Sequence, residues 1–321
     1  MAEQPKNFGF GEDEVMLRDS ARKFLSDHCS SDTLHRMVAS DFNLDRPNEC
    51  VWDQALWQQI VDLGWTAVCV PEAAGGIGMP AVAAIALAEE VGRTAFPSPL
   101  IATLSATFVL NACDSPAATA ALSEIAGGKA TALALTNIDG EWDSAATGVR
   151  VNADGRLDGL AAFVQDARKC AQFIVSAQSD TGVGLYLVSA AAEGLTLTPD
   201  SIIDLTRDQA RLTFEQVDAI ELAAPGTGHA AIDAALPGLL CLVAADMVGA
   251  GEWLLQTTVE YAKTRVQFDR PLGFFQAVKH PLVNVMLQID NAKSLTYNAA
   301  CAIDHDPAEA LRLARMAKSE A

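Results

Sequence analysis

Two long apolar segments joined by a short charged turn constrain this chain more than any other feature. Residues 230–263 and 276–303 are rich in Ala, Leu and Val, and the turn that joins them reads Arg265-Val-Gln-Phe-Asp-Arg-Pro-Leu-Gly-Phe-Phe-Gln-Ala-Val-Lys-His280. Helices that carry apolar residues on most faces need neighbours on most faces. The pattern therefore predicts a pair of long helices that meet at a corner and pack in a bundle core or at a subunit interface.

The residues of the turn leave two interpretations open. Arg265 could simply compensate the dipole at the end of the first helix, while Pro271 and Gly273 stop that helix. Alternatively, the planar fork of donors of Arg265 and the side-chain amide of Gln276 would suit the diphosphate of a nucleotide, because Arg stays charged and binds phosphate in a bidentate manner.

The pattern along the chain changes twice. Residues from about 11 to 130 have helical spacing of apolar residues, with one helix expected from Trp52 to Leu63 and another between Ser115 and Gly127. Between residues 131 and 222, short segments bounded by Gly, Asp and Asn predict an antiparallel sheet, with strands near 131–136, 173–177, 184–188 and 210–214. Pro225-Gly-Thr-Gly228 then predicts a hinge before the pattern returns to helix.

The predicted fold class is therefore α+β, with three domains. We expect an N-terminal helical domain over residues 1–130, a middle β-domain over 131–226 and a C-terminal helical bundle over 227–321. The last residues, 311–321, keep a helical pattern to their end without a capping residue. We interpret the C-terminal domain as incomplete.

Composition narrows the class of partner and the compartment. A net charge of −19 argues against binding of nucleic acid or of anionic membrane surfaces, which attract basic patches. The first residues lack the apolar stretch of a secretory signal, and the uncharged run at 234–245 is too short to span a bilayer. The cysteines have neither CxxC nor zinc spacing, so we expect no metal site and a reducing, cytoplasmic environment; they are Cys29, Cys50, Cys69, Cys113, Cys170, Cys241 and Cys301.

Three segments together resemble the acyl-CoA dehydrogenase family. The turn is similar to the family's R-x-x-F-G-x-P-I-G-x-F-Q. Leu63-Gly-Trp-Thr-Ala-Val-Cys-Val-Pro-Glu-Ala-Ala-Gly-Gly-Ile-Gly78 resembles its G-W-x-x-x-x-x-P-E-x-x-G-G-x-G run, and Glu89-Glu-Val-Gly-Arg93 resembles its E-E-x-G-R element. The segments follow one another in the family's order, and the resemblance extends over nearly the whole chain.

The resemblance implies an FAD site and assigns residues to it. Arg265, Phe268 and Gln276 match the positions that hold the diphosphate and adenosine portions of FAD across a subunit interface. Thr136 matches the first residue of T-E-P-x-A-G-S-D, which contacts flavin and thioester, although the segment here reads Thr136-Asn-Ile-Asp-Gly-Glu-Trp-Asp143. The family's W-I-T, which packs on the flavin ring, becomes Phe163-Val-Gln165 here, so the ring-contacting positions hold other side chains.

Other positions depart from the family pattern. Asp269 replaces the Gly that usually follows the Phe of the turn. The family's catalytic carboxylate usually lies beyond the equivalent of Ala321, and in some members it lies early in the first long C-terminal helix, near Leu239 here. Leu240 stands where an Arg commonly contacts coenzyme A. We therefore assign no catalytic residue, and Asp246 is the nearest substitute acid that we consider.

Three functional hypotheses follow from the resemblance. In the first, the chain is a self-sufficient homo-oligomeric acyl-CoA dehydrogenase whose C-terminal catalytic segment is missing. In the second, which the pattern of losses favours, it is the degenerate subunit of a heteromer, such as a heterotetramer acting on steroid side-chain CoA esters, whose partner supplies the base. Electron-transferring flavoprotein would then be the acceptor. In the third, the chain is a non-catalytic assembly scaffold.

Overall fold

The chain forms two compact units in the computed structural model, which describes residues 5–38, 50–141 and 143–321. One unit combines residues 1–33, 81–96 and 237–321, and the other combines residues 34–80 and 97–236. Our expectations for Met1 to Gln4 and for Trp142 fall outside the described residues. The predicted domain boundaries at residues 130 and 226 stay predictions.

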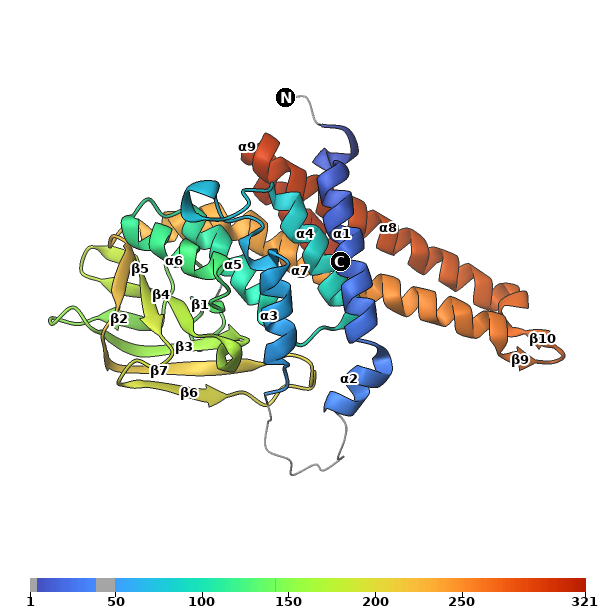
Figure 1. The fold of residues 1–321 in the computed structure, drawn as a ribbon, viewed down its shortest axis with the longest axis horizontal. Coiled ribbons are helices and arrows are strands. Elements are labelled where there is room, and N and C mark those ends of the chain that lie inside the picture. The colour runs from blue at the N-terminus through green and yellow to red at the C-terminus, as the bar shows by residue number, and fades with distance from the viewer. Residues whose placement is uncertain (1–4, 39–49, 142) are drawn as a thin grey trace. The chain divides into compact units, whose positions relative to one another are not determined.

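The second unit places short helices on a mixed sheet (Figure 1). Its helices begin after side chains suited to capping: Asp53 accepts hydrogen bonds from the amides of Ala55 and Leu56, and the Ser115 hydroxyl accepts one from Ala118. These caps confirm the two helices predicted from the sequence. The helices are α3 (Gln54–Asp62), α5 (Leu100–Asn111) and α6 (Pro116–Ala126), and α2 (Ser31–Val38) crosses from one unit to the other.

The sheet of this unit has eight strands in the order β6-β7-β3-β2-β4-β5-β8, with β1 paired to β4. Most pairs are antiparallel, and β4 is parallel to both β1 and β2. All four predicted strand segments are strands. The strands are β1 (Thr131–Ala134), β2 (Val149–Val151), β3 (Leu157–Gln165), β4 (Gln172–Ser179), β5 (Gly182–Ser189), β6 (Leu195–Pro199), β7 (Gln209–Val217) and β8 (Ile220–Ala223).

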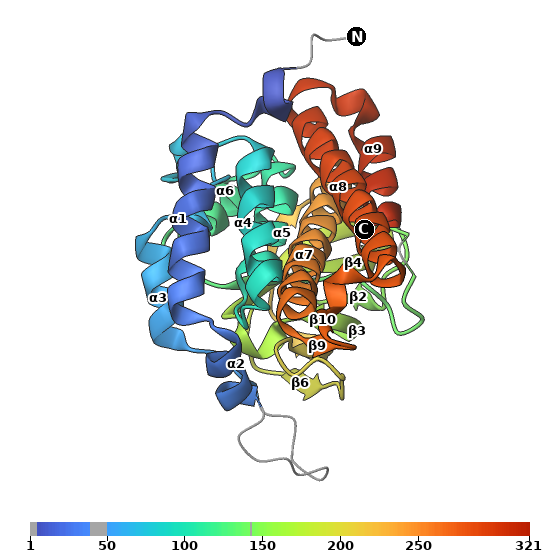
Figure 2. The same cartoon turned by 90° about the vertical axis from the view of Figure 1, so that its right-hand side faces the viewer.

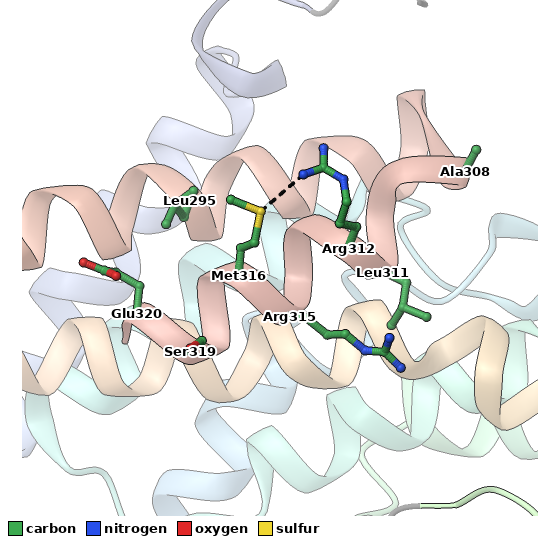
Figure 3. A pocket seen from close by; sticks show the side chains of 8 residues that line it. All are labelled: Leu295, Ala308, Leu311, Arg312, Arg315, Met316, Ser319 and Glu320. Atoms are coloured by element: carbon green, nitrogen blue, oxygen red, sulfur yellow. Dashed lines mark hydrogen bonds between the residues drawn. The ribbon is translucent and has the colours of Figure 1, made fainter.

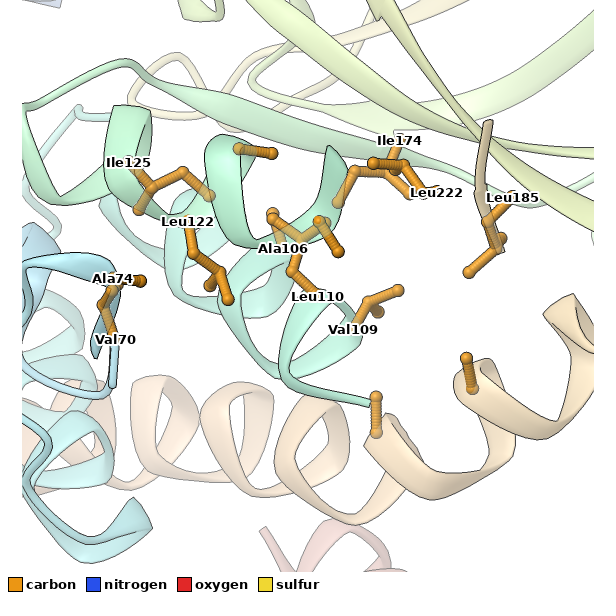
Figure 4. Packing of buried hydrophobic residues seen from close by; sticks show 14 of the residues in the cluster. Val70, Ala74, Ala106, Val109, Leu110, Leu122, Ile125, Ile174, Leu185 and Leu222 are labelled. Carbon is orange, nitrogen blue, oxygen red and sulfur yellow. The ribbon is translucent and has the colours of Figure 1, made fainter. Parts of the chain in front are cut away.

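The core of this unit lies between the sheet and helices α5 and α6 (Figure 4). Ile174 of β4 and Leu185 of β5 face Leu110 of α5 and Ile125 of α6, and all four side chains are buried. Helices α5 and α6 thus bury their apolar residues against the sheet, in an α+β arrangement.

The first unit is helical (Figure 2). The predicted helix pair is confirmed, and the pattern at residues 311–321 belongs to a further helix. The helices of this unit are α1 (Glu12–His28), α4 (Ala81–Thr94), α8 (Gln276–His305), α9 (Pro307–Glu320) and the part of α7 (Gly228–Thr264) that follows residue 236.

Helix α7 is long and apolar enough to cross a membrane by length and composition alone. It extends over 37 residues. The expectation that this segment is too short to span a bilayer was based only on the uncharged run at residues 234–245. However, 61% of its most apolar window is buried inside the protein. It is a buried core helix.

Helices α7 and α8 project together beyond α1 and α4 of their unit and carry the turn at their far end (Figure 1). We call residues 252–293 the arm. The arm contains the end of α7, the short strands β9 (Val266–Gln267) and β10 (Arg270–Pro271), the 3₁₀ turn Leu272–Phe274 and the first half of α8.

Candidate functional site

The turn at the tip of the arm is a tight β-hairpin that the sequence did not lead us to expect. Strands β9 and β10 pair antiparallel, with Gln267 opposite Arg270 and Val266 opposite Pro271. The Leu272 amide also donates a hydrogen bond of 2.9 Å to the carbonyl oxygen of Arg265. The backbone that follows Arg265 is therefore held in one conformation, which orders the base of its side chain.

The two residues at the hairpin tip have left-handed backbone conformations. Phe268 has φ 52° and Asp269 has φ 57°, as a two-residue type I′ turn requires. Gly or Asn usually occupies such positions, and a bulky aromatic residue there is strained. Asp tolerates the left-handed region better than most residues, so the Gly-to-Asp replacement at 269 preserves the shape of the turn. The strain at Phe268 indicates a functional constraint.

Arg265 and Gln276 stand on either side of this hairpin, both exposed. Among the residues that the structure describes, no carboxylate forms an ion pair with Arg265. Gln276 is the first residue of α8, where backbone N–H groups lack partners within the helix and favour an anion. The turn therefore offers a guanidinium, an amide and a helix N-terminus, a donor set that fits a diphosphate.

Aromatic side chains at the tip are exposed to an unusual degree. Phe268 is 87% exposed and Phe274 is 56% exposed. Phe275 meets both of them edge-on, with ring centroids 6.2 Å and 5.6 Å away. Clustered apolar groups that remain in water indicate a surface that another molecule covers.

The apolar surface continues from the tip along both helices of the arm. On α7, Leu254 and Tyr261 are each 58% exposed, and on α8 Leu287 is 58% exposed. Trp253, Val283, Val285 and Met286 are also at least 39% exposed. Exposed apolar side chains in this number are typical of a protein–protein interface.

In the second unit, Phe163 lies in a β-bulge of strand β3. Ala161 pairs with Leu212 and Val164 with Ala210, so β3 has one residue more than β7 between these pairs. Phe163 itself has φ 57° and is 49% exposed. Bulges re-aim side chains and are common beside active sites. The bulge turns the aromatic ring outward, as a residue that packs against a planar ligand requires.

Thr136 and Phe163 are brought together, since the Ala162 amide donates a hydrogen bond of 2.8 Å to the carbonyl oxygen of Thr136. A Cβ atom at Gly140 would lie 3.5 Å from the Phe163 ring, so the 136–141 loop borders that ring. Gln165 lies at the end of β3, opposite Gln209. The three residues thus line one end of β3. Arg265, Phe268 and Gln276 belong to the other unit.

Two ion pairs with buried carboxylates involve residues that directly follow Gln165, and the sequence analysis did not predict them. Asp166 and Lys169 are both almost fully buried, and Lys169 Nζ lies 2.7 Å from Asp166 Oδ1. Burial raises the pKa of Asp166, and the charge of Lys169 opposes that rise. Arg168 forms a second pair with buried Asp208. The pairs anchor the β3–β4 connection and so support the bulge. The only signal in the sequence was the charged run Asp166-Ala-Arg-Lys169.

The early-helix position for a catalytic base and the position for a coenzyme A contact both hold apolar side chains. Leu239 is 8% exposed within α7, and Leu240 follows it. Asp246 is partly buried on α7, where its backbone packs against Gly92 of α4. Within the described residues, no group of three or more His, Cys, Asp or Glu side chains could hold a metal ion.

An open groove lies elsewhere, between α8 and α9 (Figure 3). Leu295, Leu311 and Met316 provide its apolar lining, and Arg312 donates a hydrogen bond of 3.4 Å to the Met316 sulfur. None of the predicted site residues lines this groove.

Comparison with protein-family models gives two matches. Residues 226–321 match the acyl-CoA dehydrogenase, C-terminal domain, and residues 11–126 match the acyl-CoA dehydrogenase, N-terminal domain. The acyl-CoA dehydrogenase IpdE2 of Mycobacterium tuberculosis is 32% identical over 312 residues, which cover 97% of this chain and 81% of that protein.

Solved structures of similar fold agree with this family assignment. The Tcur3481-Tcur3483 steroid ACAD G363A variant contains a chain with a TM-score of 0.82 and 30% identity, covering 96% of this chain and 83% of that chain. A chain of the ChsE4-ChsE5 complex from Mycobacterium tuberculosis has a TM-score of 0.81 and 23% identity, covering 96% of this chain and 82% of its own length. The second likeness concerns the fold alone. Both solved structures are complexes of two different named chains.

Proposed function

The chain belongs to the acyl-CoA dehydrogenase family, and we propose that it is the non-catalytic subunit of a heteromeric member of that family. In this proposal it contributes the Arg265–Gln276 turn to an FAD diphosphate across the subunit interface. The partner, a second acyl-CoA dehydrogenase chain, supplies the carboxylate base for α,β-dehydrogenation of an acyl-CoA thioester.

The observation that carries the proposal is a contrast between two sites. The turn keeps its cation, its amide and a strained hairpin that holds them in place, and the arm around it has an exposed apolar face. At the early-helix position for a base and at the position for a coenzyme A contact, by contrast, the chain has Leu239 and Leu240. Decay without selection would not preserve the first site while losing the second.

The residues of this chain have defined roles in the proposal. Arg265 neutralises part of the diphosphate charge, Gln276 donates a hydrogen bond, and Phe268 extends toward the adenosine portion. Thr136, Phe163 and Gln165 border a flavin ring, where FAD would supply the hydride acceptor for the β-carbon. Removal of the α-proton needs a carboxylate at the reacting carbon, so that step falls to the partner.

The partner class follows from the relatives. The Tcur3481-Tcur3483 steroid ACAD, which is 30% identical to this chain and has two named chains, supports a heteromer, such as a heterotetramer, with a steroid-derived acyl-CoA as substrate. We further propose that the assembly is cytoplasmic and passes its electrons to an electron-transferring flavoprotein.

Visible absorbance of the purified protein tests the proposal. The chain would be expressed alone and then together with an acyl-CoA dehydrogenase encoded by a neighbouring gene. We expect no yellow colour alone and flavin absorbance when the two chains co-purify. A yellow isolated chain would favour a self-sufficient enzyme, and a colourless complex would favour a scaffold.

A further inference from the structure

Two fully buried carboxylates of α4 lie at the root of the arm. Glu89 and Glu90 have 0% exposure. Arg22 of α1 contacts Glu90 with distances of 2.7 Å and 3.1 Å, and Arg93 contacts both glutamates. Buried charges are costly unless they are paired and hydrogen-bonded, so the position of each cation is constrained.

The remaining partners of Glu89 come from the arm and its continuation. Lys293 Nζ of α8 lies 2.8 Å from Glu89 Oε1 and 2.8 Å from Glu252 Oε1 of α7. Tyr297 of α8 donates a hydrogen bond of 2.9 Å to Glu89 Oε2. Glu252 also contacts Arg93. Lys293 therefore joins three helices at one atom.

The charges in this cluster balance. Three carboxylates, those of Glu89, Glu90 and Glu252, face three cations, those of Arg22, Arg93 and Lys293. If α8 tilted relative to α4, Glu89 would lose its contact with Lys293, and if α7 tilted, Glu252 would lose its contact with Arg93. The cluster thus favours one direction of the arm over neighbouring directions.

The tip of the arm lies far from this root. At about 1.5 Å per residue, Thr264 lies about 18 Å along α7 from Glu252, and Gln276 lies about 25 Å along α8 from Lys293. A tilt of roughly ten degrees at the root would therefore move the tip by about 3 Å. A displacement of that size would break charge-assisted hydrogen bonds, which need about 2.7–2.9 Å between donor and acceptor.

We propose that Lys293 and Glu252 are positioning residues that set the direction of the arm and thereby place the Arg265–Gln276 turn against its ligand. The part of this proposal that concerns the ligand rests on the proposed function. The part that concerns the direction of the arm does not, because it follows from the contacts of α4, α7 and α8.

Spin-label distances test the direction of the arm in the full-length chain. Labels attached through a keto amino acid at Met16 on α1 and Lys263 near the tip would leave the cysteines untouched. We expect one narrow distance distribution in the parent protein. Lys293→Met should shift or broaden it by about 3 Å, as the arm geometry requires, and Lys293→Arg should largely restore it.

A second variant and a control make the result decisive. Glu252→Gln keeps the side-chain shape and removes only the charge, so it serves if Lys293→Met fails to fold. Lys318→Met, which removes a partly exposed lysine of α9, should leave the distances unchanged. Unchanged distances in both Lys293→Met and Glu252→Gln, together with a lower melting temperature, would mean that the cluster only stabilises the fold, and the proposal would be wrong.

Flavin retention in the co-purified complex separates this inference from the proposed function. Lys293→Met should weaken FAD binding roughly tenfold, equivalent to losing one charge-assisted hydrogen bond. If the distances change while neither Lys293→Met nor Arg265→Ala affects flavin content, the cluster positions the arm but the turn does not bind FAD.

Discussion

Gly249 of α7 lies directly against the backbone of Glu89 of α4, so that a Cβ atom at Gly249 would overlap the Glu89 carbonyl oxygen. Gly92 of α4 meets the carbonyl oxygen of Asp246 in the same way. The two helices therefore cross backbone to backbone. Only glycine permits this approach, and the approach brings the carboxylates of α4 within reach of Lys293.

Gly249→Ala should therefore destabilise the protein. The added methyl group must push α4 and α7 apart, which costs about 1–3 kcal/mol in overpacked interiors. The free energy of unfolding from urea denaturation measures the effect. Gly251→Ala is the matched control on the same helix, since its Cβ would lie 3.5 Å from Ile289 in ordinary contact. The control should be neutral or stabilise by up to about 1 kcal/mol because Ala favours helix over Gly. Equal effects of the two substitutions would contradict the close crossing.

The cluster of three carboxylates and three cations should make the free energy of unfolding depend on pH. Burial alone would raise the pKa of Glu252, but the hydrogen bond and charge of Lys293, together with Arg93, lower it below its ordinary value of 4.5. A carboxylate whose pKa is lower in the folded state stabilises that state above the pKa of the unfolded chain. This contribution is lost as pH falls through the folded-state pKa.

The comparison of parent protein and Glu252→Gln isolates that contribution. At pH 7 the parent should be the more stable of the two. The difference should begin to shrink below about pH 4.5, where Glu252 of the unfolded chain takes up a proton, and it should be lost once pH has fallen through the lower pKa of the folded state. Urea denaturation at a series of pH values measures it. A difference that stays constant down to pH 3 would show that the charge of Glu252 does not contribute.

Arg265→Ala should weaken flavin retention in the complex. A charge-assisted hydrogen bond to phosphate contributes about 1.5–3 kcal/mol, so the dissociation constant of FAD should rise by roughly one to two orders of magnitude. Fluorescence titration of the apo-complex measures it. Arg270→Ala removes the same charge from the same hairpin, where Arg270 lies 5.2 Å from the centre of the Phe274 ring. It should have a much smaller effect, and equal losses in the two variants would indicate a nonspecific role of charge.

Local sequence patterns predicted the elements of this fold well. Ser115 and Pro116 begin α6 as expected, and the apolar segments on either side of the turn form α7 and α8. These features depend on capping and on periodicity, which neighbouring residues determine.

The features that depend on distant residues were not predictable in this way. The bulge at Phe163 arises from the register between β3 and β7, and Lys293 meets Glu89 across 204 positions of sequence. Neither feature leaves a periodic signal in the sequence. The Glu89-Glu-Val-Gly-Arg93 segment was recognised through its resemblance to a family, while its partners in α1, α7 and α8 became evident only from the fold.

We expect that the isolated chain will not dehydrogenate an acyl-CoA. The early position for a base holds the buried side chain of Leu239. Loss of a positioned general base costs about two to four orders of magnitude in rate, and Asp246 could replace it only if its carboxylate reached the α-carbon of the substrate. Anaerobic mixing with medium-chain and steroid side-chain CoA esters would follow bleaching of the flavin absorbance. The isolated chain, mixed with an excess of FAD, should not bleach the flavin, whereas the complex with its partner should bleach rapidly. Rapid bleaching by the isolated chain, abolished in Asp246→Asn, would instead identify Asp246 as the base and make this chain a self-sufficient enzyme.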